Sequence, residues 1–220
     1  MNTWNEYFKI WNDARFKKGE EAHLCIQEAR KRVARNSKND WVWLKESLSN
    51  SERKWFVAEV YKFQTVPKKL FYAMLYAGIL EKDPSANRVS IEPCVRSYGA
   101  YKVIELLFRY LESGSNPEKA GAVSALYWVK SNPKDENLNE LKISFHSRML
   151  NEFIENPDLE VRRRIIPMLR LEPESYPAEI RARIPVAIKI ARNHHDEYIR
   201  HRVEIQLGAN GPFMAIPDTR

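Results

Sequence analysis

Glycine is scarce in this sequence. Seven of the 220 residues are glycine, roughly half of the usual share of about 7%. No two of these glycines are separated by a single residue, so the G-x-G-x-x-G loop of dinucleotide-binding proteins is absent. The closely set glycines of a Walker A phosphate loop are missing as well. These absences exclude two large classes of nucleotide-dependent enzyme.

Cysteine is scarcer still, and the motifs of known catalytic and metal sites are missing. Cys25 and Cys94 do not form a C-x-x-C pair, so we expect two buried thiols in a reducing compartment rather than a zinc site or a disulfide framework. No serine stands in G-x-S-x-G. The sequence therefore predicts a protein that is not an enzyme and that holds no cofactor.

One short segment is rich in the side-chain types that bind metals. It is His194-His195-Asp196-Glu197, followed by His201. Its spacing does not match H-E-x-x-H or another recognised metal motif. A turn between two helices, with Asp196 capping the second, explains the segment better than a metal site does.

Long hydrophobic runs are also missing. The longest uncharged apolar run covers residues 70–80, whereas a membrane-spanning helix needs about 20 apolar residues. The first residues carry charges inside every apolar stretch, which is unlike a signal peptide. We therefore expect a cytoplasmic protein that does not bind membranes.

Apolar residues recur at helical spacing along almost the whole chain, and strand-like alternation is nearly absent. Trp4, Phe8 and Trp11 share one face of a first helix, and a second helix follows with its apolar face at residues 22, 26, 29 and 33. Asp40 and Ser51 are the expected caps of the third and fourth helices, and the fourth is expected to bury Phe56, Val60 and Phe63. A fifth helix is expected to start at Pro67 and to end near residue 80.

In the second half of the chain, turn and capping residues recur at a regular spacing. Residues 81–92 form the clearest loop, and Pro93 is expected to open one long helix that stops at Gly114. Asn116-Pro117-Glu118 then returns forty residues later as Asn156-Pro157-Asp158, and each is expected to cap a helix with its asparagine.

A second match has a uniform offset of 38 residues. Asp158, Val161, Arg162 and Leu169 are echoed by Asp196, Ile199, Arg200 and Leu207, with partner helices expected at residues 138–154 and 180–191. A helix pair every 38–40 residues is typical of an α-solenoid.

On these residues the chain resembles HEAT-like repeats, most clearly over residues 116–207. The first helix of such a repeat often begins with a capping acidic residue, which implies caps at Asp158 and Asp196. The resemblance implies an all-α fold, a right-handed α–α superhelix of helix pairs. Residues 1–207 would be a single solenoid domain, with capping helices at 1–50 and repeats at 51–207, and residues 208–220 a non-helical tail that shields the last helix through Phe213 and Met214. Arg162 and Arg200, which follow the repeated valine or isoleucine, are expected to reach a carboxylate of the neighbouring repeat, with Asp158 and Asp196 as candidate partners.

Positive charge is concentrated near the start of the chain. The formal net charge is +7, and residues 1–70 hold 15 lysines and arginines against 9 acidic residues, while residues 71–220 hold 21 against 20. Five of the six tryptophans lie in the first 55 residues. Basic residues beside aromatic ones suit an acidic protein partner or a nucleic acid, although a solvated helix surface would have the same composition. The candidate partner-binding residues are Arg30, Lys31, Arg35, Lys38, Trp43, Lys68 and Lys69.

Two functions are compatible with these patterns. The first is a non-catalytic scaffold that holds a protein partner with an acidic face on the concave surface of the repeat array. The alternative is a nucleic-acid-binding protein similar to the HEAT-like alkylpurine DNA glycosylases, which use an aspartate near tryptophans. Asp40-Trp41-Val42-Trp43 is the comparable cluster here, and Asp13 also follows Trp11. Neither cluster reproduces that family's arrangement, so no catalytic role is transferred.

Overall fold

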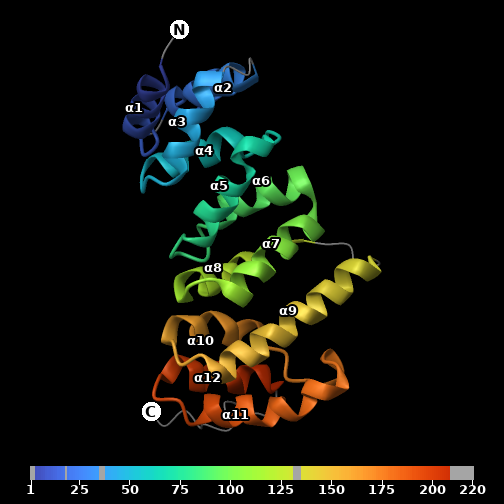
Figure 1. The fold of residues 1–220 in the computed structure, drawn as a ribbon. Helices are drawn as coiled ribbons and strands as arrows, with labels where there is room; N and C mark the ends of the chain where they lie inside the picture. The colour runs from blue at the N-terminus through green and yellow to red at the C-terminus, as the bar shows by residue number, and fades with distance from the viewer. Residues whose placement is uncertain (1–2, 18, 35–37, 131–134, 209–220) are drawn as a thin grey trace, which may run out of the picture. The chain divides into compact units, whose positions relative to one another are not determined.

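The structure is a computed structural model that describes residues 3–17, 19–34, 38–130 and 135–208. These residues form twelve α-helices and three short 3₁₀ helices, without any β-strand (Figure 1). The all-α prediction is confirmed. Two compact units make up the chain, Met1–Val103 and Ile104–Arg220. Within the described residues, no helix is both long enough and apolar enough to cross a membrane.

The N-terminal unit is built from consecutive helices that pack against one another. They are α1 (Trp4–Ala14), α2 (Glu21–Ala34), α3 (Lys38–Leu48), α4 (Arg53–Tyr61), α5 (Lys68–Ile79) and α6 (Arg88–Tyr98). Helix α7 (Ala100–Ser113) begins at the end of this unit and continues into the next. The expected first and second helices are confirmed as α1 and α2. Both cysteines are free and buried, as predicted.

An aromatic cluster forms the core where α1, α3 and α4 meet. Phe56 is fully buried, and the rings of four residues have their centroids 5.6 to 6.3 Å from its own: Trp4, Phe8, Trp11 and Trp43. Aromatic rings at these distances attract each other beyond the effect of burying their surface. This cluster therefore holds α1, α3 and α4 together.

Three expectations for α3 and α4 are wrong. Asp40 lies inside the first turn of α3 and pairs with Arg32 at 2.8 Å, so it is not a cap. Asn50, not Ser51, accepts hydrogen bonds from the first free backbone N–H groups of α4, at Glu52 and Arg53. Phe63 is 71% exposed rather than buried. Helix α4 ends at Tyr61, so Phe63 has left the helix before its side chain would turn towards the core.

The expected long helix after Pro93 is also wrong. Pro93 lies inside α6, which begins at Arg88, within the segment expected to be a loop. The chain breaks instead at Gly99, whose φ of +81° is in the left-handed region that glycine adopts without steric cost. Gly99 therefore separates α6 from α7.

The C-terminal unit contains most of α7 and the remaining helices. These are α8 (Asn116–Leu126), α9 (Glu136–Glu155), α10 (Leu159–Ile165), η1 (Ile166–Met168), η2 (Pro173–Ser175), η3 (Ala178–Arg183), α11 (Ile184–Arg192) and α12 (Glu197–Gln206). The expected partner helices appear as α9 and α11, although 3₁₀ turns replace the start of the second.

The repeated aspartates cap their helices as predicted. The Oδ1 atom of Asp158 accepts a hydrogen bond from the backbone N–H of Val161 at 2.9 Å, and Asp196 Oδ1 accepts from that of Ile199 at 3.1 Å. Val161 and Ile199 are fully buried. The asparagine caps, however, are wrong. At α8 the cap is Ser115, which forms a reciprocal capping box with Glu118.

The repeated arginines do not reach carboxylates, so this expectation is wrong. Arg162 donates to the carbonyls of residues 153 and 154 at 3.1 and 3.4 Å, and Arg200 donates to those of residues 194 and 195 at 2.6 and 2.9 Å. These carbonyls close the preceding helix or its turn, where partners within the helix are lacking. Arg163, one residue further along α10, does reach a carboxylate, because it donates to Asp196 at the start of α12 at 2.6 Å.

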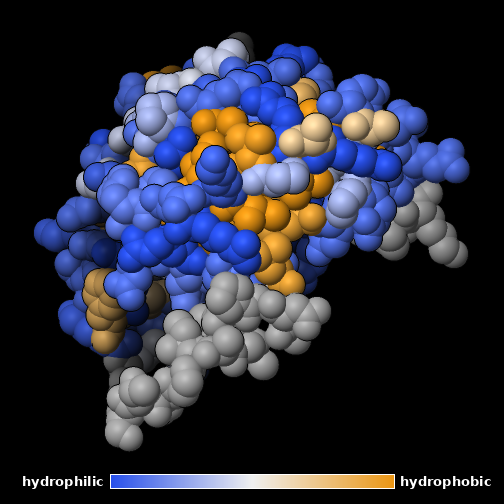
Figure 2. All heavy atoms as spheres, turned by 90° about the horizontal axis from the view of Figure 1, so that it is seen from below, coloured by the Kyte–Doolittle hydropathy of each residue, from blue (hydrophilic) through white to orange (hydrophobic). Residues whose placement is uncertain are grey.

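Hydrophobic side chains gather on one face of the C-terminal unit among hydrophilic ones (Figure 2). Three large side chains of α11 and α12 are exposed: Val186, Tyr198 and Ile205. Apart from Gly208, the tail expected to shield this end, with Phe213 and Met214, lies outside the described residues.

Candidate functional site

The sequence-predicted binding residues do not share one environment. Lys31 pairs with Glu28 at 2.7 Å, and both side chains are more than half exposed. Lys68 and Lys69 are exposed in the first turn of α5. Arg35 lies outside the described residues, as does the side chain of Lys38. Arg30 and Trp43 are engaged in contacts of the fold.

Trp43 belongs to the aromatic cluster of the core. Its ring stacks on Trp4 with centroids 5.7 Å apart and planes 16° apart. Its Nε1–H donates to the Oδ1 atom of Asn5 at 2.8 Å, and the guanidinium of Arg53 lies 5.5 Å from the ring centre. A ring held by these contacts stabilises α1, α3 and α4, and it is poorly placed to stack on a ligand.

Phe63, unlike Trp43, is an exposed aromatic ring with two cations beside it. It lies in the loop of residues 62–67 that joins α4 to α5. The guanidinium of Arg30 and the ammonium of Lys62 each lie 5.6 Å from the centre of its ring. Both distances are within the range of cation–π attraction.

Two arginines from other helices hold the start of this loop. Arg30 of α2 donates from Nε to the carbonyl of Val60 at 3.0 Å and from Nη2 to that of Glu59 at 2.8 Å. Arg96 of α6 donates to the carbonyl of Lys62 and, at 3.4 Å, to that of residue 61. The last carbonyls of a helix have no partner within the helix. The two side chains supply those partners for α4.

The end of the same loop is bound to α6. The backbone N–H of Val66 donates to the hydroxyl of Ser97 at 2.9 Å, and the hydroxyl of Tyr98 donates to the carbonyl of Val66 at 2.8 Å. The loop is thus tied to neighbouring helices at both ends. Phe63 is presented to solvent by a constrained backbone.

Cations gather around this loop. We call the surface the basic edge and define it by six residues: Arg30, Lys62, Phe63, Lys68, Lys69 and Arg96. Lys62 also pairs with Glu59 at 3.3 Å, a surface pair in which both side chains are partly exposed. Helix α5 has no acidic residue in its first turn, where acidic side chains would stabilise the helix dipole and cations do not. The two lysines therefore do not serve the stability of their helix.

Sequence reasoning missed half of the basic edge, namely Lys62, Phe63 and Arg96. Phe63 fits the helical spacing of α4, so periodicity assigned it to the core. One signal was present. Gln64 and Thr65 follow Phe63 directly and lead to Val66-Pro67, and the residue before a proline disfavours helix.

The histidine-rich segment in the C-terminal unit is engaged in structural contacts. The Nδ1 atom of His194 accepts a hydrogen bond from the backbone N–H of Asp196 at 3.0 Å, and its ring stacks on that of His195. Burial lowers the pKa of His194, and the neighbouring His195 and Arg162 lower it further. Among the described residues, no group of three or more His, Cys, Asp or Glu side chains is placed to hold a metal ion.

Comparisons with known proteins add no family. No protein-family model, curated protein or solved structure matches the chain. The fold itself defines the class. It is an all-helical protein whose helices pack against neighbours in the sequence, an arrangement compatible with a helical repeat.

Proposed function

We propose that this protein is a non-catalytic binding module of the HEAT-like type, and that its basic edge holds an acidic segment of a protein partner. The observation that carries the proposal is the 71% exposure of Phe63 between Arg30 and Lys62. The aspartate caps and the carbonyl-bound arginines, repeated at an offset of 38 residues, support the repeat type.

The chemistry of the edge favours an acidic partner with apolar side chains. An exposed aromatic ring offers a large contact area, and arginines beside it are typical of the residues that dominate protein interfaces. Positive charges around the ring attract carboxylates and raise the rate of encounter. Because the loop is already held at both ends, binding would cost little ordering of the backbone.

Nucleic acid is the second candidate, because an exposed aromatic ring among cations also stacks bases. The use of the arginines argues against it. Arg30 and Arg96 already donate to backbone carbonyls, so fewer of their N–H groups remain for phosphate oxygens. The two arginines keep their positive charge. That charge attracts the carboxylates of a protein as well as it attracts phosphates.

The test is a binding titration of the full chain with two labelled probes. One is a short peptide in which glutamate alternates with phenylalanine, and the other is oligothymidylate. We expect saturable peptide binding that weakens by about tenfold in Phe63→Ala, the loss typical of an interface hot spot. Phe16→Ala is the matched control, because Phe16 is also exposed and also has an arginine guanidinium over its ring.

The other outcomes are equally informative. Peptide binding that falls as much in Phe16→Ala as in Phe63→Ala would remove the basic edge as the site. Oligothymidylate binding that persists between about 50 and 200 mM salt and depends on Phe63 would replace the protein partner by a single-stranded nucleic acid.

A further inference from the structure

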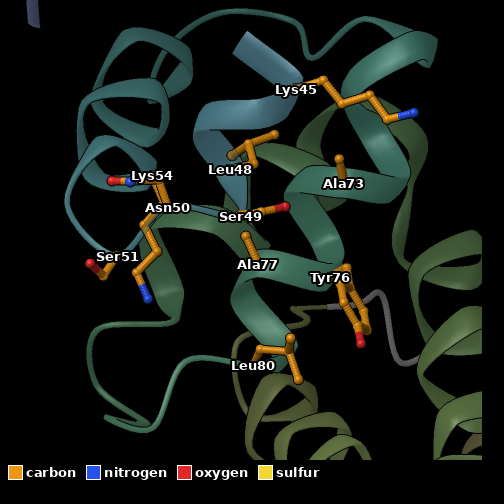
Figure 3. A pocket seen from close by; sticks show the side chains of 10 residues that line it. All are labelled: Lys45, Leu48, Ser49, Asn50, Ser51, Lys54, Ala73, Tyr76, Ala77 and Leu80. Carbon is orange, nitrogen blue, oxygen red and sulfur yellow. The ribbon is translucent and has the colours of Figure 1, made fainter. Parts of the chain in front are cut away.

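A pocket lies in the N-terminal unit where the end of α3, the start of α4 and the length of α5 meet (Figure 3). Its volume is about 580 Å³, within the range of roughly 300–1,000 Å³ typical of small-molecule sites. The side chains that line it are Lys45, Leu48, Ser49, Asn50, Ser51, Lys54, Ala73, Tyr76, Ala77 and Leu80. None of these residues belongs to the basic edge.

The floor of the pocket is apolar because small side chains stand where large ones would fill it. Ala73 and Ala77 are one helical turn apart on α5, and Leu48 of α3 lines the same space. Leu80 follows Ala77 at the end of the same floor and is 44% exposed. An apolar group placed here would cover hydrophobic surface that water now contacts.

The rim of the pocket is polar and positive. Its charged side chains are both lysines, Lys45 and Lys54. Lys54 pairs with Glu81 at 2.5 Å, whereas Lys45 is exposed and has no ion-pair partner among the described residues. The N-cap of α4 is an acidic residue, Glu52, so the positive charge of the rim comes from Lys45 rather than from the start of this helix. Ser49 and Ser51 supply hydroxyl groups that can donate to an anion.

We propose that this pocket binds a small amphipathic carboxylate, with its alkyl or aryl group over Ala73 and Ala77 and its carboxylate at the Lys45 rim. The apolar floor selects the body of the ligand and the lysine selects the sign of its charge. A single unpaired lysine, with no arginine in the lining, suits one negative charge better than the several oxygens of a phosphate group.

The experiment is calorimetric titration of the full chain with decanoate, decanol and decylamine, each below its aggregation concentration. We expect decanoate to bind saturably, decanol to bind more weakly and decylamine to bind weakest. Ala73→Leu places a larger side chain in the pocket and should weaken decanoate at least tenfold. Lys45→Met should weaken decanoate by about fivefold, the size expected of one exposed ion pair, and should leave decanol unchanged.

Two control variants distinguish decanoate binding in the pocket from non-specific binding and from binding at the basic edge. Lys9→Met removes an exposed lysine of α1 that does not line the pocket, and it should leave decanoate binding unchanged. Phe63→Ala should also leave it unchanged, so failure here is distinguishable from failure of the basic edge. Melting curves establish that Ala73→Leu is folded, and perturbation of the Ala77 and Leu80 methyl resonances by decanoate locates the ligand independently of that variant.

Three results would overturn the inference. One is the absence of saturable decanoate binding. Another is binding that Ala73→Leu leaves intact without perturbing those methyl resonances. The last is equal affinity for decanol and decanoate with no effect of Lys45→Met, which would leave an apolar pocket without selectivity for carboxylates.

Discussion

In the N-terminal unit α1, α3 and α4 meet through one cluster of aromatic rings, whereas in the C-terminal unit the same polar contacts recur 38 residues apart beside buried aliphatic side chains. Phe56 lies at the centre of the first cluster. In the second unit Val161 and Ile199 are fully buried beside the caps that recur 38 residues apart. Rings from three helices pack together at one place in the first unit, while a local pattern of caps recurs along the second.

Both units contain arginines that bind the ends of helices, but these arginines come from different places in the sequence. In both, arginines donate to the carbonyls that end a helix. At the end of α9 and in the turn after α11, the arginine lies five to nine residues further along the chain, on α10 or α12. For α4 the arginines come from α2 and α6, about thirty residues away in either direction. The contact is part of a sequence repeat in one unit and depends on the packing of distant helices in the other.

The largest expected loss of stability comes from the aromatic cluster of the N-terminal unit. Phe56→Ala removes the ring at the centre of the aromatic cluster and should cost about 3–5 kcal/mol of unfolding free energy. Five of the six tryptophans lie in the first 55 residues, so urea unfolding followed by tryptophan fluorescence reports this unit. Phe16→Ala, at an exposed position, should change stability by less than about 0.5 kcal/mol. A cost below about 1 kcal/mol for Phe56→Ala would contradict a core that depends on this ring.

The next effect belongs to the C-terminal unit and depends on pH. Burial lowers the pKa of His146 to about 4, and Arg170 and Lys142 add to the shift. The unfolded chain takes up this proton first, so the stabilisation is complete above pH 6.5, the ordinary pKa, and is lost as the pH falls from there to about 4. The loss should reach about 3 kcal/mol.

Melting temperatures measured across this pH range by circular dichroism check the prediction. His146→Met keeps a similar volume without a titrating group, so its melting temperature should depend less on pH over the same window. An unchanged pH dependence in the variant would assign the effect to other groups.

The third comparison concerns the arginines that bind the ends of helices. Arg30→Met and Arg162→Met each remove donors to two helix-ending carbonyls, and each should cost about 1.5–2 kcal/mol. Arg→Lys at either position should restore only part of this, because an ammonium lacks the planar fork of the guanidinium. Lys31→Met is the control, because its surface pair with Glu28 is worth at most about 0.5 kcal/mol. Equal behaviour of Arg30→Met and Lys31→Met in denaturation would contradict the role of Arg30.

The smallest effect concerns the repeated caps. Asp158→Ala should cost about 1 kcal/mol through loss of the cap. Asp196→Ala should cost more, because Asp196 also accepts from Arg163, a contact that lowers the pKa of its carboxyl group. Asp158→Asn retains a capping oxygen and should be close to the parent protein. Unchanged melting temperatures in both alanine variants would show that these aspartates are not structural caps.

Several elements could be predicted because they depend on interactions a few residues apart. The caps at Asp158 and Asp196 each bind a backbone N–H three residues on, and the spacing of Trp4 and Trp11 indicates one helix face whatever surrounds it. The break between α6 and α7 was assigned wrongly. Proline at residue 93 is the stronger local signal, but it is tolerated inside α6, and the positive φ of Gly99 is not visible in a sequence.

The candidate site was less predictable for a different reason. Composition placed surplus positive charge and most tryptophans in the first third of the chain, but it did not show which aromatic ring is exposed. Trp43 and Phe63 both fit a helical face. Trp43 packs on Trp4 across two helices, and Phe63 is exposed because α4 ends two residues before it.

The sequence by itself therefore determined the all-helical class, the repeated caps and the location of the surplus charge, because each follows from composition or from contacts within one helical turn. The tertiary structure decided which of those charged side chains also bind a neighbouring helix. Arg30 and Lys31 are adjacent in the sequence, yet Arg30 is bound to the end of α4 and Lys31 lies at the surface. Neighbouring residues of a helix point about 100° apart, so only the position of a second helix determines which of them it contacts.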